Sequence, residues 1–114
     1  MTFLEILKII LAVGTIATGL ISLIRPRSVQ GFTGLNAPGP RGVAEIRAVL
    51  GGGFIGLGLA PLILGAPAAY QMLGITYLAI AVARVAGIAL DRSFERSNWI
   101  SLVVEIIAGI ILVL

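Results

Sequence analysis

The stretch RGVAEIRAVLGGGFIGLGLAPLIL, residues 41–64, decides how the rest of the chain is interpreted. It is long and apolar enough to cross a bilayer core of about 30 Å, which takes about 20 apolar residues as a helix. Yet Glu45 and Arg47 stand near its start, and glycines follow at positions 51, 52, 53, 56 and 58. Charges are costly in lipid, and glycine weakens most helices. Both are tolerable if the charges pair and the glycines let helices approach closely, so the stretch predicts a helix packed among other membrane helices.

The composition supports this interpretation and excludes several classes of protein. Of the 114 residues, 59% are hydrophobic and 11% are charged, which is more apolar surface than a soluble domain of this size can bury. The net charge of +3 forms no dense basic face, so we expect no nucleic-acid partner. Without cysteine or histidine there are no disulfides, no usual zinc site and no usual haem ligand. The five acidic residues are scattered, so we expect no metal site and no cofactor.

Four apolar segments divide the chain. We expect one transmembrane domain over residues 1–114, with helices at about 3–24, 43–64, 68–90 and 99–114. Prolines and glycines make residues 25–42 a true loop, whereas residues 65–67 form a tight turn and residues 91–98 a short polar link. Short links make consecutive helices antiparallel. The sequence therefore predicts an all-α fold, an integral membrane four-helix bundle with antiparallel up-down topology.

The basic residues of the connections predict an orientation. Arginines lie in the first connection (positions 25, 27 and 41) and in the third (92 and 96), while the second turn and the C-terminus have no basic residue. The positive-inside rule then places the first and third connections in the cytoplasm and both termini outside. The N-terminal segment MTFLEILK lacks the basic start of a signal peptide, so we expect it to remain as a helix.

Rows of small residues mark the expected helix contacts. In lipid, close backbone approach replaces the hydrophobic effect as the source of helix association, and small residues spaced by four allow it. The second segment carries the row Ala48, Gly52, Gly56 and Ala60, and the third carries Ala83 and Gly87. Gly51 and Gly58 lie on another side of an ideal helix. The rows predict packing within one tight bundle, or a homodimer formed through Gly52 and Gly56.

Four charged residues fall within the apolar segments. Arg84 and Glu105 lie equally far from the middle of the link between their helices, so a hairpin puts them at the same depth. The same geometry puts Arg47 level with Arg84 and Glu45 about one turn nearer the cytoplasm. Charges in lipid are bearable when paired, so the sequence predicts one buried charge layer of Glu45, Arg47, Arg84 and Glu105.

Polar residues accompany these charges on the same helix faces. Arg84 shares a face with Tyr77 and Asp91, and Glu105 shares a face with Asn98. Two interpretations stay open. The layer either locks the register of the bundle, or it lines a small cytoplasm-facing polar cavity. Such a cavity would suit an anionic headgroup, a small metabolite or a quinone carbonyl.

Two elements of the chain resemble a known family. The pattern E-x-R-x-x-x-G-G occurs at Glu45, Arg47, Gly51 and Gly52, and R-x-x-G-x-x-x-D occurs at Arg84, Gly87 and Asp91. With a glutamate in the last helix, this order resembles a family of small four-helix bacterial membrane proteins of unknown function, related to the DoxX-like group. The resemblance implies a four-helix bundle in the bacterial inner membrane. It implies no activity.

Three functions are compatible with these features. The first is a membrane scaffold or accessory subunit in the lipid bilayer, alone, as a homo-oligomer or in a larger membrane complex. The second is binding or transport of a small lipid-like or anionic ligand, which requires an open cavity at Arg47 and Arg84. The third is an enzyme, for which Glu45, Glu105 and Tyr77 are the only candidate groups. Nothing visibly activates them, so we assign no catalytic residue and rank the scaffold first and the enzyme last.

Overall fold

The computed structural model, which describes residues 1–114, begins with helix α1 (Phe3–Ile24). Its start is a capping box. The Thr2 hydroxyl accepts the backbone N–H of Glu5, and the Glu5 carboxylate accepts that of Thr2, both at 3.1 Å. The helix ends before Pro26, which cannot continue it. The first connection then forms a short 3-10 turn, η1 (Pro26–Ser28), and helix α2 (Val29–Thr33).

The second apolar segment is one continuous helical rod with a change of hydrogen bonding in its middle. It begins as α3 (Pro40–Glu45), becomes the π-helix η2 (Ile46–Gly53) and continues as α4 (Phe54–Leu64). Gly65 ends it in the left-handed conformation, with a φ of 64° that glycine adopts without strain.

The other two apolar segments are α5 (Pro67–Asp91) and α6 (Arg96–Val113). Proline stands at the first position of α5, where its missing N–H is not needed. Together with α1 and the rod from Pro40 to Leu64, they give four helices long and apolar enough to cross a membrane. The chain therefore has the features of a multi-pass membrane protein.

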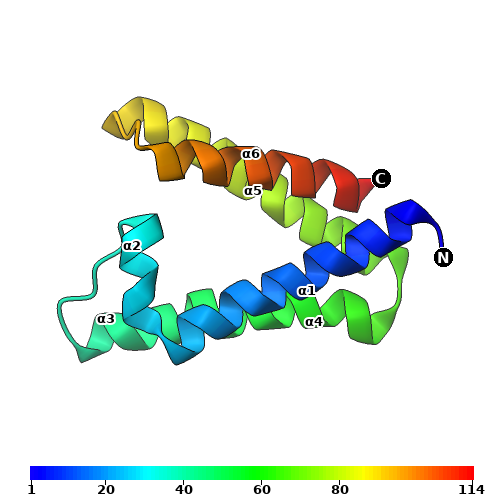
Figure 1. Ribbon diagram of the computed structural model, residues 1–114, viewed down its shortest axis with the longest axis horizontal. Helices are drawn as coiled ribbons and strands as arrows, with labels where there is room; N and C mark the ends of the chain where they lie inside the picture. The colour runs from blue at the N-terminus through cyan, green and yellow to red at the C-terminus, as the bar shows by residue number, and fades with distance from the viewer.

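The helices pair as two hairpins (Figure 1). In the first hairpin α1 packs along η2 and α4, and in the second α5 packs along α6. The hairpins meet at the end that carries both chain termini, here called the terminal end, and diverge toward the end that carries residues 25–39 and 92–95, here called the loop end. Short α2 lies between them there and contacts α6. One closed antiparallel four-helix bundle is therefore not confirmed.

The buried apolar residues form three small clusters instead of one continuous core. Ala12, Leu73 and Leu112 join α1, α5 and α6 in one buried cluster, with Leu57 of α4 packed against it. A second cluster lies inside the α5–α6 hairpin, and a third ties the first connection to α3 and η2. Only the first cluster involves all four membrane-length helices, so it is the joint between the two hairpins.

Glycines make the closest helix contacts, as expected, but they are other glycines than the predicted ones. A Cβ on Gly58 would lie 2.5 Å from the Ala12 carbonyl oxygen of α1, and one on Gly51 would lie 3.1 Å from Leu23 Cα. In the second hairpin, a Cβ on Gly74 would lie 2.9 Å from the Gly109 carbonyl oxygen. A side chain at these positions would push the helices apart.

The predicted rows, apart from half-buried Ala60, do not pack within the chain. A Cβ on Gly56 or Gly87 would meet nothing within 4 Å, and one on Gly52 would approach only the Arg47 carbonyl oxygen of its own rod, at 4.0 Å. Ala48 and Ala83 are exposed. Within one chain the predicted packing role of Ala48, Gly52, Gly56, Ala83 and Gly87 is wrong. Contact of the Gly52 row with a second chain stays a prediction.

Candidate functional site

An ion pair between helices joins Arg84 of α5 to Glu105 of α6. Arg84 Nε donates to Glu105 Oε1 and Nη2 donates to Oε2, both at 2.7 Å. Two parallel bonds of this kind match the fork of a guanidinium to a carboxylate. The side chains are 29% and 10% exposed, respectively. The pair that the sequence predicts is thus present, and it neutralises a charge that would be costly alone in an apolar segment.

The polar contacts continue from this pair toward the loop end. Arg84 Nη1 donates to Asn98 Oδ1 at 2.8 Å, and Asn98 Nδ2 donates to the carbonyl oxygen and the hydroxyl of Ser93, at 3.1 and 3.0 Å. The Ser93 hydroxyl donates in turn to Glu95 at 2.5 Å. A hydrogen-bonded chain therefore links buried Glu105 to the connection between α5 and α6.

Glu95, at the outer end of these hydrogen bonds, has a lowered pKa. The Ser93 hydroxyl, followed by the backbone N–H of Glu95 itself, stabilises the ionised carboxylate and lowers the pKa of Glu95 below its usual value. Because this pKa is lower in the folded state, the stabilising contribution is complete above the usual pKa of glutamate. It is lost as the pH falls through the lowered pKa.

Glu45 and Arg47 do not belong to this network, so the prediction of a single four-charge layer is wrong. Glu45 forms an exposed ion pair with Arg41, one turn earlier on the same helix. Arg47 donates to the Leu23 carbonyl oxygen in the last turn of α1, where a helix has no internal donor for that group. Both residues lie on the first hairpin, which diverges from α5 and α6 toward the loop end, so equal depth does not bring them into contact with the Arg84–Glu105 pair (Figure 1).

Tyr77 and Asp91 also lie apart from the ion pair. The Tyr77 hydroxyl bonds to the Thr15 hydroxyl at 2.6 Å, and Thr15 donates to the Leu11 carbonyl oxygen, so Tyr77 is the donor to Thr15. This bond connects α5 to α1 beside the joint between the hairpins. Asp91 is exposed at the end of α5 and forms no ion pair.

The arrangement can fix helices α5 and α6 in place. No buried side-chain nitrogen or oxygen lacks a hydrogen-bond partner. No three His, Cys, Asp or Glu side chains come together as metal ligands would. Glu105 accepts two hydrogen bonds from the Arg84 guanidinium, so both of its oxygens are engaged.

Two surface grooves lie away from the ion pair. One, of about 570 Å³, runs between α4 and α5 and is lined mostly by small residues, including Gly52, Gly53, Gly56, Ala60 and Ala69. The other, of about 490 Å³, follows the start of α6 and is lined by Phe94, Arg96, Trp99, Ile100, Val103 and Val104. Sequence reasoning missed the second groove, although an arginine, an aromatic residue and β-branched residues at positions 96, 99, 100, 103 and 104 repeat with helical spacing.

Comparison with known proteins identifies a family without an activity. The chain belongs to the family described as domain of unknown function DUF4345, whose model matches residues 3–114. No curated protein and no solved structure matches the chain. The matched residues include all four membrane-length helices, so the residues described above lie within the family domain.

Proposed function

We propose that this protein is a membrane scaffold or accessory subunit that receives a partner helix in the groove between α4 and α5. The observation that carries the proposal is the open row of Gly52 and Gly56, which contacts no helix of its own chain. Helices associate in lipid where small residues let backbones come close. This groove offers such a surface beside a rod that already uses Gly51 and Gly58 to hold α1.

The charges support the same proposal. The scaffold hypothesis requires a sealed charge pair, and the Glu105 carboxylate is held by two bonds and 10% exposed. Neither groove described above is lined by Arg47 or Arg84, whereas the ligand hypothesis requires a cavity at both. The polar residues therefore serve to hold α5 against α6, and the groove remains the surface open to a partner.

Native mass spectrometry after gentle release from the membrane tests this proposal. We expect the wild-type protein to appear as a homo-oligomer or with a defined set of other subunits. Gly56→Leu fills the groove and should shift the protein to a monomer, because backbone approach is blocked. Gly14→Leu is the matched control, since Gly14 also lies in a membrane-length helix with nothing within 4 Å of its added Cβ. A wild-type monomer, or equal effects of both variants, would contradict the proposal.

A second candidate, binding of a small lipid-like or anionic ligand at Arg84, rests on one specific observation. Three N–H groups of the guanidinium donate in the bonds given above, of the five that arginine has. The side chain is 29% exposed, so the remaining donors can reach a carbonyl or phosphate oxygen. A stoichiometric small molecule on the wild-type protein that is absent from Arg84→Lys would favour this function.

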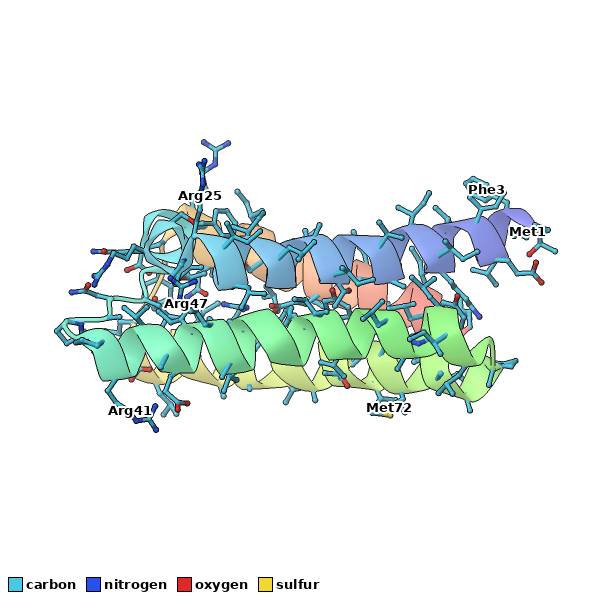
Figure 2. All side chains as sticks on the ribbon, turned by 90° about the horizontal axis from the view of Figure 1, so that it is seen from below. Met1, Phe3, Arg25, Arg41, Arg47 and Met72 are labelled. Carbon is cyan, nitrogen blue, oxygen red and sulfur yellow. The ribbon has the colours of Figure 1, made fainter.

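The finer placement of the protein belongs to the same proposal. We place it in the bacterial inner membrane, with the loop end in the cytoplasm and both termini outside. The positions of the arginines support this orientation, since Arg25, Arg41 and Arg47 lie at the loop end while Met1 and Phe3 lie at the other (Figure 2). A relation to the DoxX-like group rests on the sequence resemblance alone.

A further inference from the structure

The charges of this protein are distributed very unevenly along its length. The terminal end carries Glu5 and Lys8, and the middle carries the Arg84–Glu105 pair, so both regions are neutral apart from the chain termini. All other arginines and acidic side chains lie toward the loop end, six against three. The net charge of +3 therefore lies at this end, and it comes from residues 25–47, because the two arginines of residues 91–96 are balanced by Asp91 and Glu95. Arg25, Arg92 and Arg96 form no ion pair.

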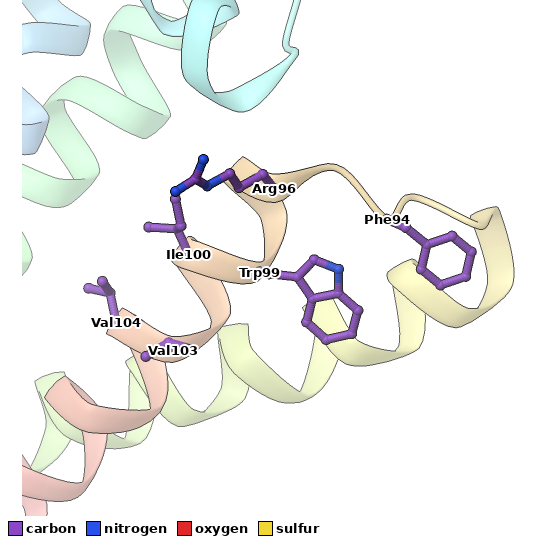
Figure 3. A pocket seen from close by; sticks show the side chains of 6 residues that line it. All are labelled: Phe94, Arg96, Trp99, Ile100, Val103 and Val104. Carbon is purple, nitrogen blue, oxygen red and sulfur yellow. The ribbon is translucent and has the colours of Figure 1, made fainter.

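The groove at the start of α6 lies at this basic end (Figure 3). Arg96 is the first residue of α6, Trp99 follows one turn later, and Phe94 of the preceding connection also lines the groove. Ile100, Val103 and Val104 continue the groove along the helix. All six residues are exposed. Val104 lies about 12 Å farther than Arg96 along the helix axis, at a rise of 1.5 Å per residue.

The side chains along the groove change from charged to aromatic to aliphatic, in the same order as the phosphate, interface and acyl chain of a phospholipid. An unpaired guanidinium binds a phosphate, aromatic rings favour the boundary between headgroup and acyl chain, and branched aliphatic side chains pack against an acyl chain. We propose that the groove of Phe94, Arg96, Trp99, Ile100, Val103 and Val104 binds one anionic phospholipid. Its phosphate lies at Arg96, and one acyl chain lies along Ile100, Val103 and Val104.

Arg96 is the one charged residue that lines the groove, and its charge favours an anionic occupant over a zwitterionic one. Glu95 stands next to Arg96, but its carboxylate accepts the Ser93 hydroxyl and forms no ion pair with either Arg92 or Arg96. The Arg96 guanidinium therefore has no ion pair that would compete with a phosphate. A protein helix is a poorer occupant, because the groove has β-branched and aromatic walls and no small residue for backbone approach.

Trp99 is the only tryptophan of the chain, which makes the proposal directly measurable. The purified protein is placed in bilayers in which a set fraction of the lipid carries brominated acyl chains, which quench tryptophan on contact. We expect brominated phosphatidylglycerol to quench Trp99 more strongly than brominated phosphatidylcholine at equal fraction. The expected preference is about fivefold in relative binding constant, which corresponds to roughly 1 kcal/mol for one cationic side chain beside anionic lipid.

Variants distinguish a specific lipid site at Arg96 from a general effect of surface charge. Arg96→Gln should remove the preference for phosphatidylglycerol, and Arg96→Lys should keep most of it. Arg25→Gln is the matched control, because Arg25 is an exposed, unpaired arginine of the same end outside the groove, and its variant should keep the preference. Helix content by circular dichroism shows that the variants remain folded.

Equal quenching by both lipids, a preference that persists in Arg96→Gln, or a preference lost in Arg25→Gln would each overturn the proposal. Absence of quenching by any lipid would show that protein covers the groove and would overturn it as well.

Discussion

The Arg84–Glu105 pair shows how one residue choice satisfies several buried groups at once. A guanidinium presents fixed donors in a plane, so Arg84 holds both oxygens of Glu105 and the amide oxygen of Asn98 together. A lysine ammonium has one nitrogen and could not match this geometry. Sequence reasoning predicted the ion pair because hairpin geometry fixes depth. The contacts of Asn98 with Arg84 and Ser93 could not be predicted, because they depend on side-chain rotamers.

Removing one partner of this pair should be costly. Glu105→Gln leaves the Arg84 charge without its carboxylate in an apolar segment, so we expect a loss of about 3 kcal/mol in the free energy of unfolding. Titration with a denaturing detergent, followed by circular dichroism, measures the loss. The double variant with Arg84→Gln should recover part of it, because no charge is then left unpaired.

Glu45→Gln is the control at the same scale. It breaks the exposed pair with Arg41, and exposed pairs contribute roughly 0.2–1 kcal/mol. Equal losses for Glu105→Gln and Glu45→Gln would mean that the Arg84–Glu105 pair is solvated and has no special structural role.

At the scale of the element, the rod from Pro40 to Leu64 packs through Gly51 and Gly58 and contains the π-helix η2. Buried Ile46 and Gly51 are five residues apart, which places them about 140° apart on an ideal α-helix. In a π-helix the hydrogen bonds span five residues, so the two positions come to the same face. Gly51 and Gly58 nevertheless lie on one side of the rod and Gly52 and Gly56 on another, as an ideal helix predicts, and the wheel could not show which side faces α1. The sequence predicts the length of the rod well, since that depends on apolarity and on Pro40 and Gly65.

Alanine substitutions at two glycines of the same helix should have opposite effects. Gly58→Ala puts a Cβ 2.5 Å from a backbone oxygen of α1, so the helices must separate, and we expect a loss of about 2 kcal/mol. Gly56→Ala meets nothing within the chain and should stabilise the monomer by roughly 0.5 kcal/mol, because alanine favours the helix more than glycine does. Unfolding in detergent at protein concentrations that keep the monomer measures both. A loss at Gly56 and none at Gly58 would contradict the packing described here.

At the scale of the whole molecule, the helices of each hairpin pack against each other more extensively than the two hairpins do. Each hairpin has a long seam, whereas the joint between them consists of the cluster around Ala12, Leu73 and Leu112 and the bond between Thr15 and Tyr77. The sequence predicted four apolar segments and their order. It could not predict the divergence of the hairpins, because hydrophobic periodicity in lipid does not distinguish a face covered by protein from one covered by acyl chains.

The orientation of the molecule can be measured with single cysteines, since the chain has none of its own. Gly31→Cys lies at the loop end with open space around its Cβ, and Ala66→Cys lies exposed in the turn at the terminal end. We expect a membrane-impermeant maleimide to label Ala66→Cys in intact cells and Gly31→Cys only after the membrane is opened. The reverse labelling would mean that the protein is inserted the other way.

The concentration of net charge at one end also makes the protein sensitive to the transmembrane voltage. Moving one elementary charge across a membrane is worth about 2.3 kcal/mol per 100 mV. For the net charge of +3 at the loop end, an inside-negative potential of this size therefore favours one orientation by roughly 7 kcal/mol over its inverse. A membrane potential therefore stabilises the molecule in that orientation. Collapse of the potential would remove this contribution while every contact within the protein stayed the same.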